Sequence, residues 1–196
     1  MKIKKLEYYD DAYHWKLDTV EFLENLNLLV GVSGVGKTRI LQSINSLRGI
    51  ANGFSFNGVK WNICFVDGDQ VEYSWSGEFE TKAGDIPVGN ELDNKKKFKV
   101  IKEVLKRKGK TIVDRSQTEI ILNGTRTPKL SPFSSVVELL KEEDSILPVR
   151  SELDKIRLIN IEKRDTEALW RLPVSIFKKY ERSTLKAGLF HSKKGL

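Results

Sequence analysis

Residues 31–38 of the chain read GVSGVGKT and fit the phosphate-binding loop pattern G-x-x-x-x-G-K-[ST]. In such a loop, glycines without a Cβ atom let successive backbone N–H groups turn toward one phosphate. The lysine amine reaches the β- and γ-phosphates, and the Ser or Thr hydroxyl is placed to bind Mg²⁺. The pattern therefore predicts a nucleotide site with Lys37 on the phosphates and Thr38 on the metal ion.

The nucleotide expected at this loop is ATP, bound with Mg²⁺. GTPases read guanine with an N/T-K-x-D motif, and the chain contains no such motif. Arg39 follows the loop and is directed either to phosphate or to an acidic neighbour. The predicted nucleotide-binding residues are consecutive: Gly31, Val32, Ser33, Gly34, Val35, Gly36, Lys37, Thr38 and Arg39. Four nearby aromatic residues are candidates either for stacking on adenine or for plain core packing: Tyr8, Tyr9, Tyr13 and Trp15.

The loop lies between two patterns that predict the elements that must position it. Residues 26–30 form a nearly continuous apolar run, as in a buried strand of a parallel sheet. After Lys37 the apolar positions follow helical spacing until about Gly49: Ile40, Leu41, Ile44 and Leu47. This strand–loop–helix order is the context in which the motif is expected to bind phosphate.

The remaining sequence predicts mainly short antiparallel strands. A hairpin over residues 3–8 and 14–22 precedes the loop, and residues 76–97 read as a long loop. Residues 98–109 are ambiguous, since their apolar spacing suits a helix while their neighbours suggest strands. Further strands are predicted at residues 61–66, 70–75, 111–115, 118–124 and 156–161, and short helices at residues 134–141 and 151–155.

Hydrolysis also needs an acidic group for Mg²⁺, and Asp67 is the candidate in this sequence. Residues 63–69, ICFVDGD, have the apolar-run-then-Asp form of a Walker B strand. The competing interpretation is a hairpin in which Asp67 and Gly68 form the turn, because QVEYSW follows at once with alternating apolar residues. The alternation favours the hairpin, so the catalytic acid remains unassigned.

Composition suits a globular protein in the cytoplasm. The chain has 196 residues, 39% of them hydrophobic and 31% charged. No apolar run approaches the roughly 18 residues that a membrane span needs, and no secretory signal follows the first residues. The single cysteine, Cys64, has no internal disulfide partner. We therefore expect a cytoplasmic location and no membrane association.

The net charge of +7 is concentrated in two segments. Residues 95–110 contain nine Lys or Arg against one Glu, and residues 163–196 contain nine against three acidic residues. Such clustering is typical of nucleic-acid surfaces, although lysine-rich runs are more often solvated faces. Contact with DNA is thus a hypothesis for Lys95, Lys96, Lys97 and the basic C-terminal segment.

The sequence KIKKLEYY, followed by FLENLNLLVGVSGVGKTRILQSI, resembles the N-terminal part of ABC-class ATPases of the SMC/RecF/OLD type. Ser33 stands where that group most often has Asn. The later run IKEVLKRKGKTIVDRSQTEIILNG, then SSVVELL, resembles the β-subdomain insertion of bacterial AAA-type ATP-binding proteins in this group. The resemblance implies an α/β fold, namely a P-loop NTPase half-domain with an antiparallel β-subdomain, and favours a strand for the ambiguous residues 98–109.

The family pattern also includes parts that this sequence lacks. We find no LSGG-like signature, no late Walker B acid pair and no switch histidine, since His191 lies in the basic tail with no strand before it. The resemblance implies that a second ATPase subunit or a missing C-terminal half completes the site. It further implies work in DNA repair or anti-phage defence, alongside a nuclease or effector partner.

Two other functions remain open from the sequence. A small self-contained P-loop phosphotransferase would use Asp67, and a non-catalytic module would use bound ATP only to order a nucleic-acid-binding surface. In each case residues 1–162 are expected to form the ATP-binding lobe, and residues 163–196 a separate basic segment. The sequence favours neither hydrolysis by this chain alone nor hydrolysis only in an assembly.

Overall fold

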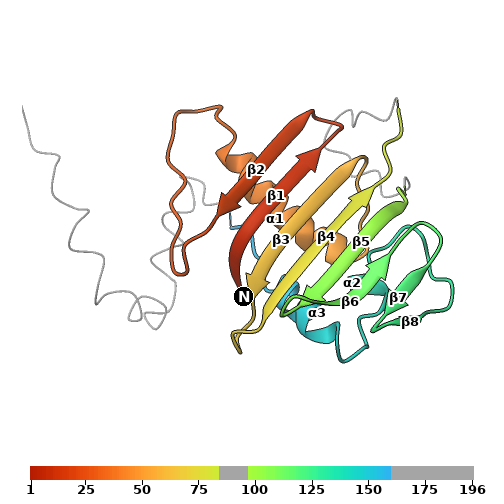
Figure 1. Ribbon diagram of the computed structural model, residues 1–196. Helices are drawn as coiled ribbons and strands as arrows, with labels where there is room; N and C mark the ends of the chain where they lie inside the picture. The colour runs from red at the N-terminus through yellow and green to blue at the C-terminus, as the bar shows by residue number, and fades with distance from the viewer. Residues whose placement is uncertain (84–96, 160–196) are drawn as a thin grey trace, which may run out of the picture. The chain divides into compact units, whose positions relative to one another are not determined.

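The computed structural model describes residues 1–83 and 97–159, and Met1–Leu158 form one compact unit (Figure 1). The chain is mixed α/β and dominated by strands. The strands are β1 (Lys2–Asp10), β2 (Trp15–Glu21), β3 (Val59–Val66), β4 (Glu72–Phe79), β5 (Val100–Arg107), β6 (Lys110–Arg115), β7 (Ile120–Leu122) and β8 (Thr125–Arg126). The helices are α1 (Lys37–Ala51), α2 (Val136–Leu139) and α3 (Leu147–Asp154).

All eight strands form one antiparallel sheet in the order β2-β1-β3-β4-β5-β6-β7-β8. From β3 onward each strand pairs with the next one along the chain, so short turns suffice to connect most of them. Three predicted hairpins are thereby confirmed: β1 with β2, β3 with β4, and β6 with β7. The ambiguous residues 98–109 contain β5, which confirms the extended alternative.

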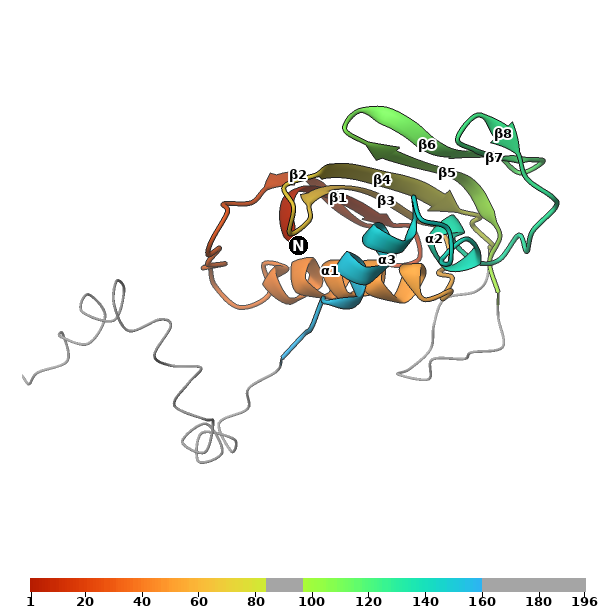
Figure 2. The ribbon, with the colours of Figure 1, turned by 90° about the horizontal axis from the view of Figure 1, so that it is seen from below.

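The helices lie against one face of the sheet, as the view in Figure 2 shows. The core between them is rich in aromatic side chains, and Trp61 packs on Trp75 and Phe79 with ring centroids 5.2 and 5.3 Å apart. The Trp61 ring also accounts for the glycine at position 77, its partner in β4. A Cβ atom on Gly77 would stand 2.3 Å from the Trp61 ring, so no larger residue fits without moving the tryptophan.

Helix α1 confirms the helix predicted after the glycine loop. It buries Leu47, Ile50 and Ala51 against the sheet, while Leu41 near its start stays 43% exposed. The helix therefore packs mainly through its second half, and its N-terminal half is left close to solvent.

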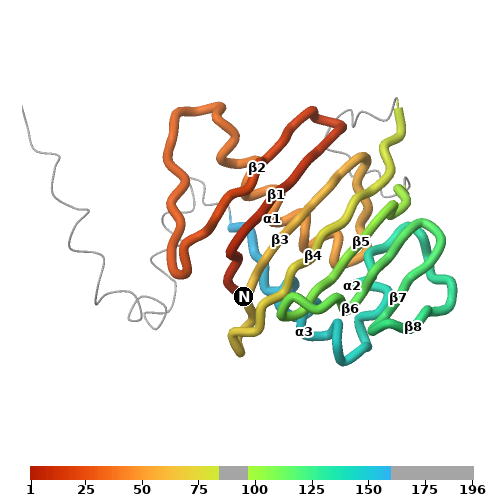
Figure 3. The backbone as a smooth tube through the Cα atoms, viewed as in Figure 1, coloured from red at the N-terminus to blue at the C-terminus, as the bar shows by residue number. Residues whose placement is uncertain are grey.

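The strand predicted just before the glycine loop does not form, and that prediction is wrong. Residues 26–30 have no strand conformation, and Leu26, Leu28 and Val30 are between 73% and 81% exposed. In Figure 3 the connection from β2 to α1 swings away from the sheet edge. A strand needs hydrogen-bonded neighbours, and β2, the edge strand nearest in sequence, pairs only with β1 in the part of the chain that the structure describes.

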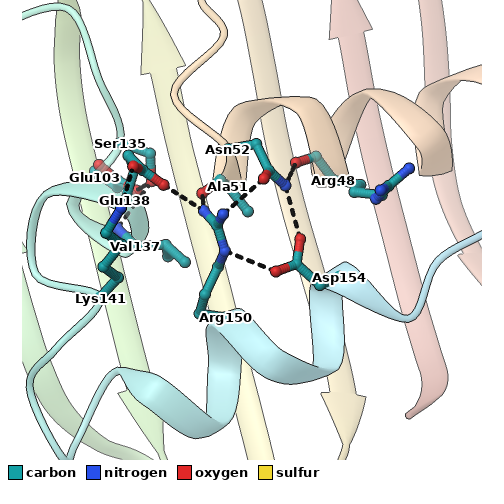
Figure 4. A network of polar contacts seen from close by, with 10 residues as sticks. All are labelled: Arg48, Ala51, Asn52, Glu103, Ser135, Val137, Glu138, Lys141, Arg150 and Asp154. Carbon is teal, nitrogen blue, oxygen red and sulfur yellow. Dashed lines mark hydrogen bonds and ion pairs between the residues drawn. The ribbon is translucent and has the colours of Figure 1, made fainter.

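Two salt-bridged clusters hold α2 and α3 to the rest of the unit, and Figure 4 shows the first of them together with Glu103 and Ser135 of the second. In the first, the Arg150 guanidinium on α3 donates to the Ala51 carbonyl, to Asn52 Oδ1 (2.6 Å), to Glu138 Oε2 (2.5 Å) and to Asp154 Oδ2 (2.9 Å). Arg150 thus satisfies a carbonyl at the C-terminal end of α1 and joins all three helices.

The second cluster surrounds Glu103, which is fully buried on β5. Its carboxylate accepts hydrogen bonds from Trp75 Nε1 (2.8 Å), Ser135 Oγ (2.6 Å) and the Val136 N–H (2.8 Å). Burial raises the pKa of Glu103, while these donors and the nearby Arg115 charge oppose that rise. Ser135 is also the N-cap of α2, so the cluster fixes the start of that helix.

Other sequence-based expectations meet the described residues only in part. The predicted helices at residues 134–141 and 151–155 correspond to the shorter α2 and to α3. The described residues 156–159 of the predicted final strand adopt no strand conformation. Lys95, Lys96, His191 and the basic segment 163–196 lie outside the described residues. Within residues 1–83 and 97–159, no helix combines the length and apolar character needed to cross a bilayer.

Candidate functional site

The glycine loop forms a tight turn that leads directly into α1. Gly34 and Gly36 have φ values of 87° and 92°, a conformation that residues with a side chain rarely adopt. Gly36 is the N-cap of α1, and the helix begins at Lys37, as the motif predicts. The positive end of the helix dipole and its first free N–H groups therefore face the loop.

The Lys37 side chain folds back over the loop that precedes it. Its Nζ donates to the carbonyl oxygens of Gly31 and Val32, both at 2.7 Å. A Cβ on Gly31 would meet the Val35 side chain at 3.1 Å, which shows how closely the loop turns on itself. Two loop carbonyls thus hold the lysine ammonium at an exposed position, and Thr38 beside it is exposed on the first turn of the helix.

A cleft of about 280 Å³ lies beside the loop, between the β1–β2 hairpin and α1. Three aromatic residues, Tyr8, Tyr13 and Trp15, line its hairpin side. Trp15 also approaches the glycine loop, because its Nε1 lies 3.8 Å from where a Cβ on Gly36 would stand. The cleft and the glycine loop are therefore neighbours that share the Trp15 side chain.

The helix side of the cleft is polar. Arg39, Gln42, Ser43 and Ser46 lie on one face of α1, at the three-, four- and seven-residue spacings of a helix. This polar stripe went unnoticed in the sequence because the apolar stripe beside it was the stronger signal. Polar residues at helical spacing directly after the glycine loop are the sequence signal that could have predicted this side of the cleft.

Arg39 and Asp10 give the cleft its charge distribution. The Arg39 guanidinium carbon stands 5.8 Å from the centre of the Tyr13 ring, so the side chain turns toward the hairpin. Burial raises the pKa of Asp10, while the Tyr13 N–H and the Arg39 charge oppose the rise. Arg39 therefore lies near an acidic residue, one of its two predicted partners, and its contact with phosphate stays a prediction.

Asp67 closes the turn between β3 and β4, which confirms the hairpin interpretation. Its Oδ1 accepts the backbone N–H groups of Asp69 and Val71, both at 2.9 Å. The side chain is 8% exposed, and this acceptor role accounts for its burial.

Asp67 and the glycine loop lie at opposite ends of β1. Asp67 follows Val66, which pairs with Lys2 at the start of β1, whereas Trp15 pairs with the last residue of β1 and adjoins Gly36. Eight residues of a strand span about 27 Å. That separation is too large for Asp67 to share a metal ion with Thr38.

Comparisons of the chain with protein-family models, with curated proteins and with solved structures gave no match. In the described residues, no group of three or more His, Cys, Asp or Glu side chains is arranged to hold a metal ion. The geometry of the loop and the cleft must therefore support any functional conclusion.

Proposed function

We propose that the chain binds ATP with Mg²⁺ at the glycine loop and serves as one half of an ATPase. The observation that supports it most is the loop itself, with Gly34 and Gly36 at positive φ and Lys37 Nζ bonded to two loop carbonyls. Backbone N–H groups, a helix N-terminus and a lysine ammonium together suit a polyphosphate. The Thr38 hydroxyl on the first helical turn would bind the metal ion.

The adjacent cleft is the proposed place for the base. Its aromatic side chains present flat apolar surfaces, and Asp10 and Gln42 offer hydrogen-bonding groups at its edges. Because Trp15 borders both the cleft and Gly36, a nucleotide with its phosphates in the loop has the cleft within reach of its base.

The proposal leaves hydrolysis to a completed assembly. Asp67 lies beside the end of β1 that is far from the glycine loop. Among the described residues we propose no other carboxylate as a ligand of the metal ion. A second ATPase subunit or a further half of the protein would supply the catalytic acid, as the resemblance to SMC/RecF/OLD-type ATPases implies. By the same resemblance, we propose that the assembly acts in DNA repair or anti-phage defence.

Replacing Lys37 tests the nucleotide site. Lys37→Ala should weaken ATP affinity about 10- to 150-fold, because hydrogen bonds from a charged donor contribute about 1.5–3 kcal/mol each. Isothermal titration calorimetry with ATP and Mg²⁺ measures the change. Lys106→Ala, on the distant strand β5, is the matched control and should bind as the unaltered chain does. Equal ATP affinity in both variants would refute the assignment of the site.

A further inference from the structure

The glycine loop by itself does not select a base, because every nucleoside triphosphate carries the same phosphates. Selection between bases has to come from the cleft beside the loop, which lies between the β1–β2 hairpin and α1. The hydrogen-bonding groups of its side chains therefore decide which base the cleft accepts.

Most polar side chains that line the cleft can both donate and accept a hydrogen bond. The Gln42 amide and the serine and tyrosine hydroxyls are of this kind, and they can turn to suit either an amine or a carbonyl on a base. Arg39 and Trp15 only donate. Among the described residues that line the cleft, Asp10 is the one whose side chain, when ionised, only accepts.

Asp10 is placed close to the glycine loop by the hairpin. It is the last residue of β1 and pairs with Trp15, the first residue of β2. The Trp15 Nε1 atom lies 3.8 Å from where a Cβ on Gly36 would stand, so one indole side chain separates Asp10 from the start of α1. A nucleotide with its phosphates in the loop would bridge this gap with its ribose and bring its base beside Asp10.

The turn of the hairpin does not need the negative charge of Asp10. The Asp10 Oδ1 atom accepts the Tyr13 N–H at 3.3 Å, and the Ala12 N–H also favours the carboxylate. A neutral asparagine caps such a turn as well. Burial disfavours the charge and raises the pKa of Asp10. The charge is therefore more costly than the turn requires, which indicates a second role for this side chain.

Arg39 faces the same cleft and leaves the Asp10 carboxylate open to a ligand. Its charge favours the ionised form of Asp10, yet its guanidinium turns toward the Tyr13 ring. In the part of the chain that the structure describes, Arg39 forms no ion pair with Asp10. A carboxylate has about four acceptor sites, so the turn N–H groups leave room for one more donor.

We propose that Asp10 selects adenine by accepting a hydrogen bond from the exocyclic amine of a base bound in the cleft. This inference rests on the proposed function and adds the residue that determines base specificity. Guanine and hypoxanthine carry a carbonyl oxygen in place of that amine. Facing Asp10, this oxygen would leave two acceptors opposed and unpaired, which disfavours both bases.

Calorimetry with ATP and with inosine triphosphate, each with Mg²⁺, tests the role of Asp10. The unaltered full chain should bind ATP about 10- to 150-fold more tightly than inosine triphosphate. In the Asp10→Asn chain this ratio should fall below about threefold, because an amide can turn to accept from the amine or donate to the carbonyl. Both ligands carry the same triphosphate, so any general effect of removing the charge cancels in the ratio.

Asp67→Asn is the matched control. Asp67 also caps a hairpin turn through its Oδ1 atom, but about 27 Å from the loop end of β1. The same chemical change there should leave the full preference for ATP. The Asp10→Asn chain keeps an acceptor for the Tyr13 N–H and should keep its fold, which circular dichroism verifies.

Two results would overturn the role of Asp10: equal binding of the two nucleotides by the unaltered chain, or a full preference for ATP in the Asp10→Asn chain. If tripolyphosphate still binds and Lys37→Ala still weakens ATP binding, the nucleotide site stands and only this inference fails. A chain that binds neither ATP nor tripolyphosphate would refute the proposed function and this inference together.

Discussion

Lys37 is already held in place within the proposed nucleotide site. Its ammonium is held by two loop carbonyls at 2.7 Å, so it already lies within the turn. Phosphate oxygens would compete with these carbonyls, and a charged acceptor makes a stronger hydrogen bond to an ammonium than a neutral carbonyl does. The loop therefore loses little by exchanging one set of acceptors for the other.

Some residues of the cleft can be replaced without disturbing the fold, and others cannot. Tyr8 is buried in the core, and its burial raises the pKa of its hydroxyl, so removing it would disturb the sheet. Tyr13 is 51% exposed and contacts Arg39, which makes it the better probe of base binding.

Tyr13→Ala should weaken ATP binding about 5- to 150-fold, because base–aromatic stacking contributes about 1–3 kcal/mol. Affinity for inorganic tripolyphosphate should stay the same, since that ligand occupies the loop and has no base. Calorimetry with the two ligands measures both effects. Tyr9→Ala is the matched control. Tyr9 follows the cleft residue Tyr8 on β1, and neighbouring residues of a strand point to opposite faces of the sheet. A Tyr13→Ala chain with unchanged ATP affinity would show that the cleft does not hold the base.

The position of helix α1 depends on residues far along the chain. Its N-terminal end holds the loop, and its C-terminal end is held by Arg150 from α3, about a hundred residues later. Asn52 completes this contact, since its side chain bonds the Arg48 carbonyl and Asp154. The orientation of the glycine loop therefore depends on the packing of α3 as well as on its own glycines.

Arg150→Lys should destabilise the unit by about 2–3 kcal/mol, because a lysine ammonium cannot reach four acceptors that a planar guanidinium bonds together. Urea unfolding followed by circular dichroism measures the loss. Lys141→Ala removes another cation that pairs with Glu138, but at an exposed position, and should change stability by less than about 0.5 kcal/mol. Similar values for the two variants would mean that the cluster in Figure 4 contributes no more than a surface ion pair.

The described unit contains a glycine loop of the phosphate-binding pattern, and in the described residues we assign no catalytic acid beside it. The sheet is antiparallel throughout and places Asp67 about 27 Å from the loop end of β1. The apolar connection before the loop is likewise uncovered. Both features agree with a protein that acts as part of a larger assembly.

The isolated chain should therefore bind ATP but turn it over negligibly, at all protein concentrations. Phosphate release in the presence of Mg²⁺, measured from nanomolar to tens of micromolar chain, tests this. Turnover proportional to concentration at an ordinary enzyme rate, about 1–10³ per second, would contradict the proposal. If such turnover occurred, the Asp67→Asn variant would show whether Asp67 is the catalytic acid, because only then should the substitution abolish the turnover.

The local elements could be predicted from the amino-acid sequence. The hairpin turns, the helix after Lys37 and the strand–turn–strand around Asp67 follow from glycine positions, apolar alternation and helical spacing, which act over a few residues. The same local signals located the glycine loop, since its positive φ values are a property of its glycines.

Which of these elements lie next to one another could not be predicted in the same way. Residues 26–30 read as a buried strand, yet burial requires neighbours, and in the described residues none lies beside them. The cleft likewise depends on the β1–β2 hairpin folding against α1, which brings Asp10 near Arg39 across nearly thirty residues. Such contacts depend on how the sheet and helices pack, and a local pattern carries no information about a partner that lies elsewhere.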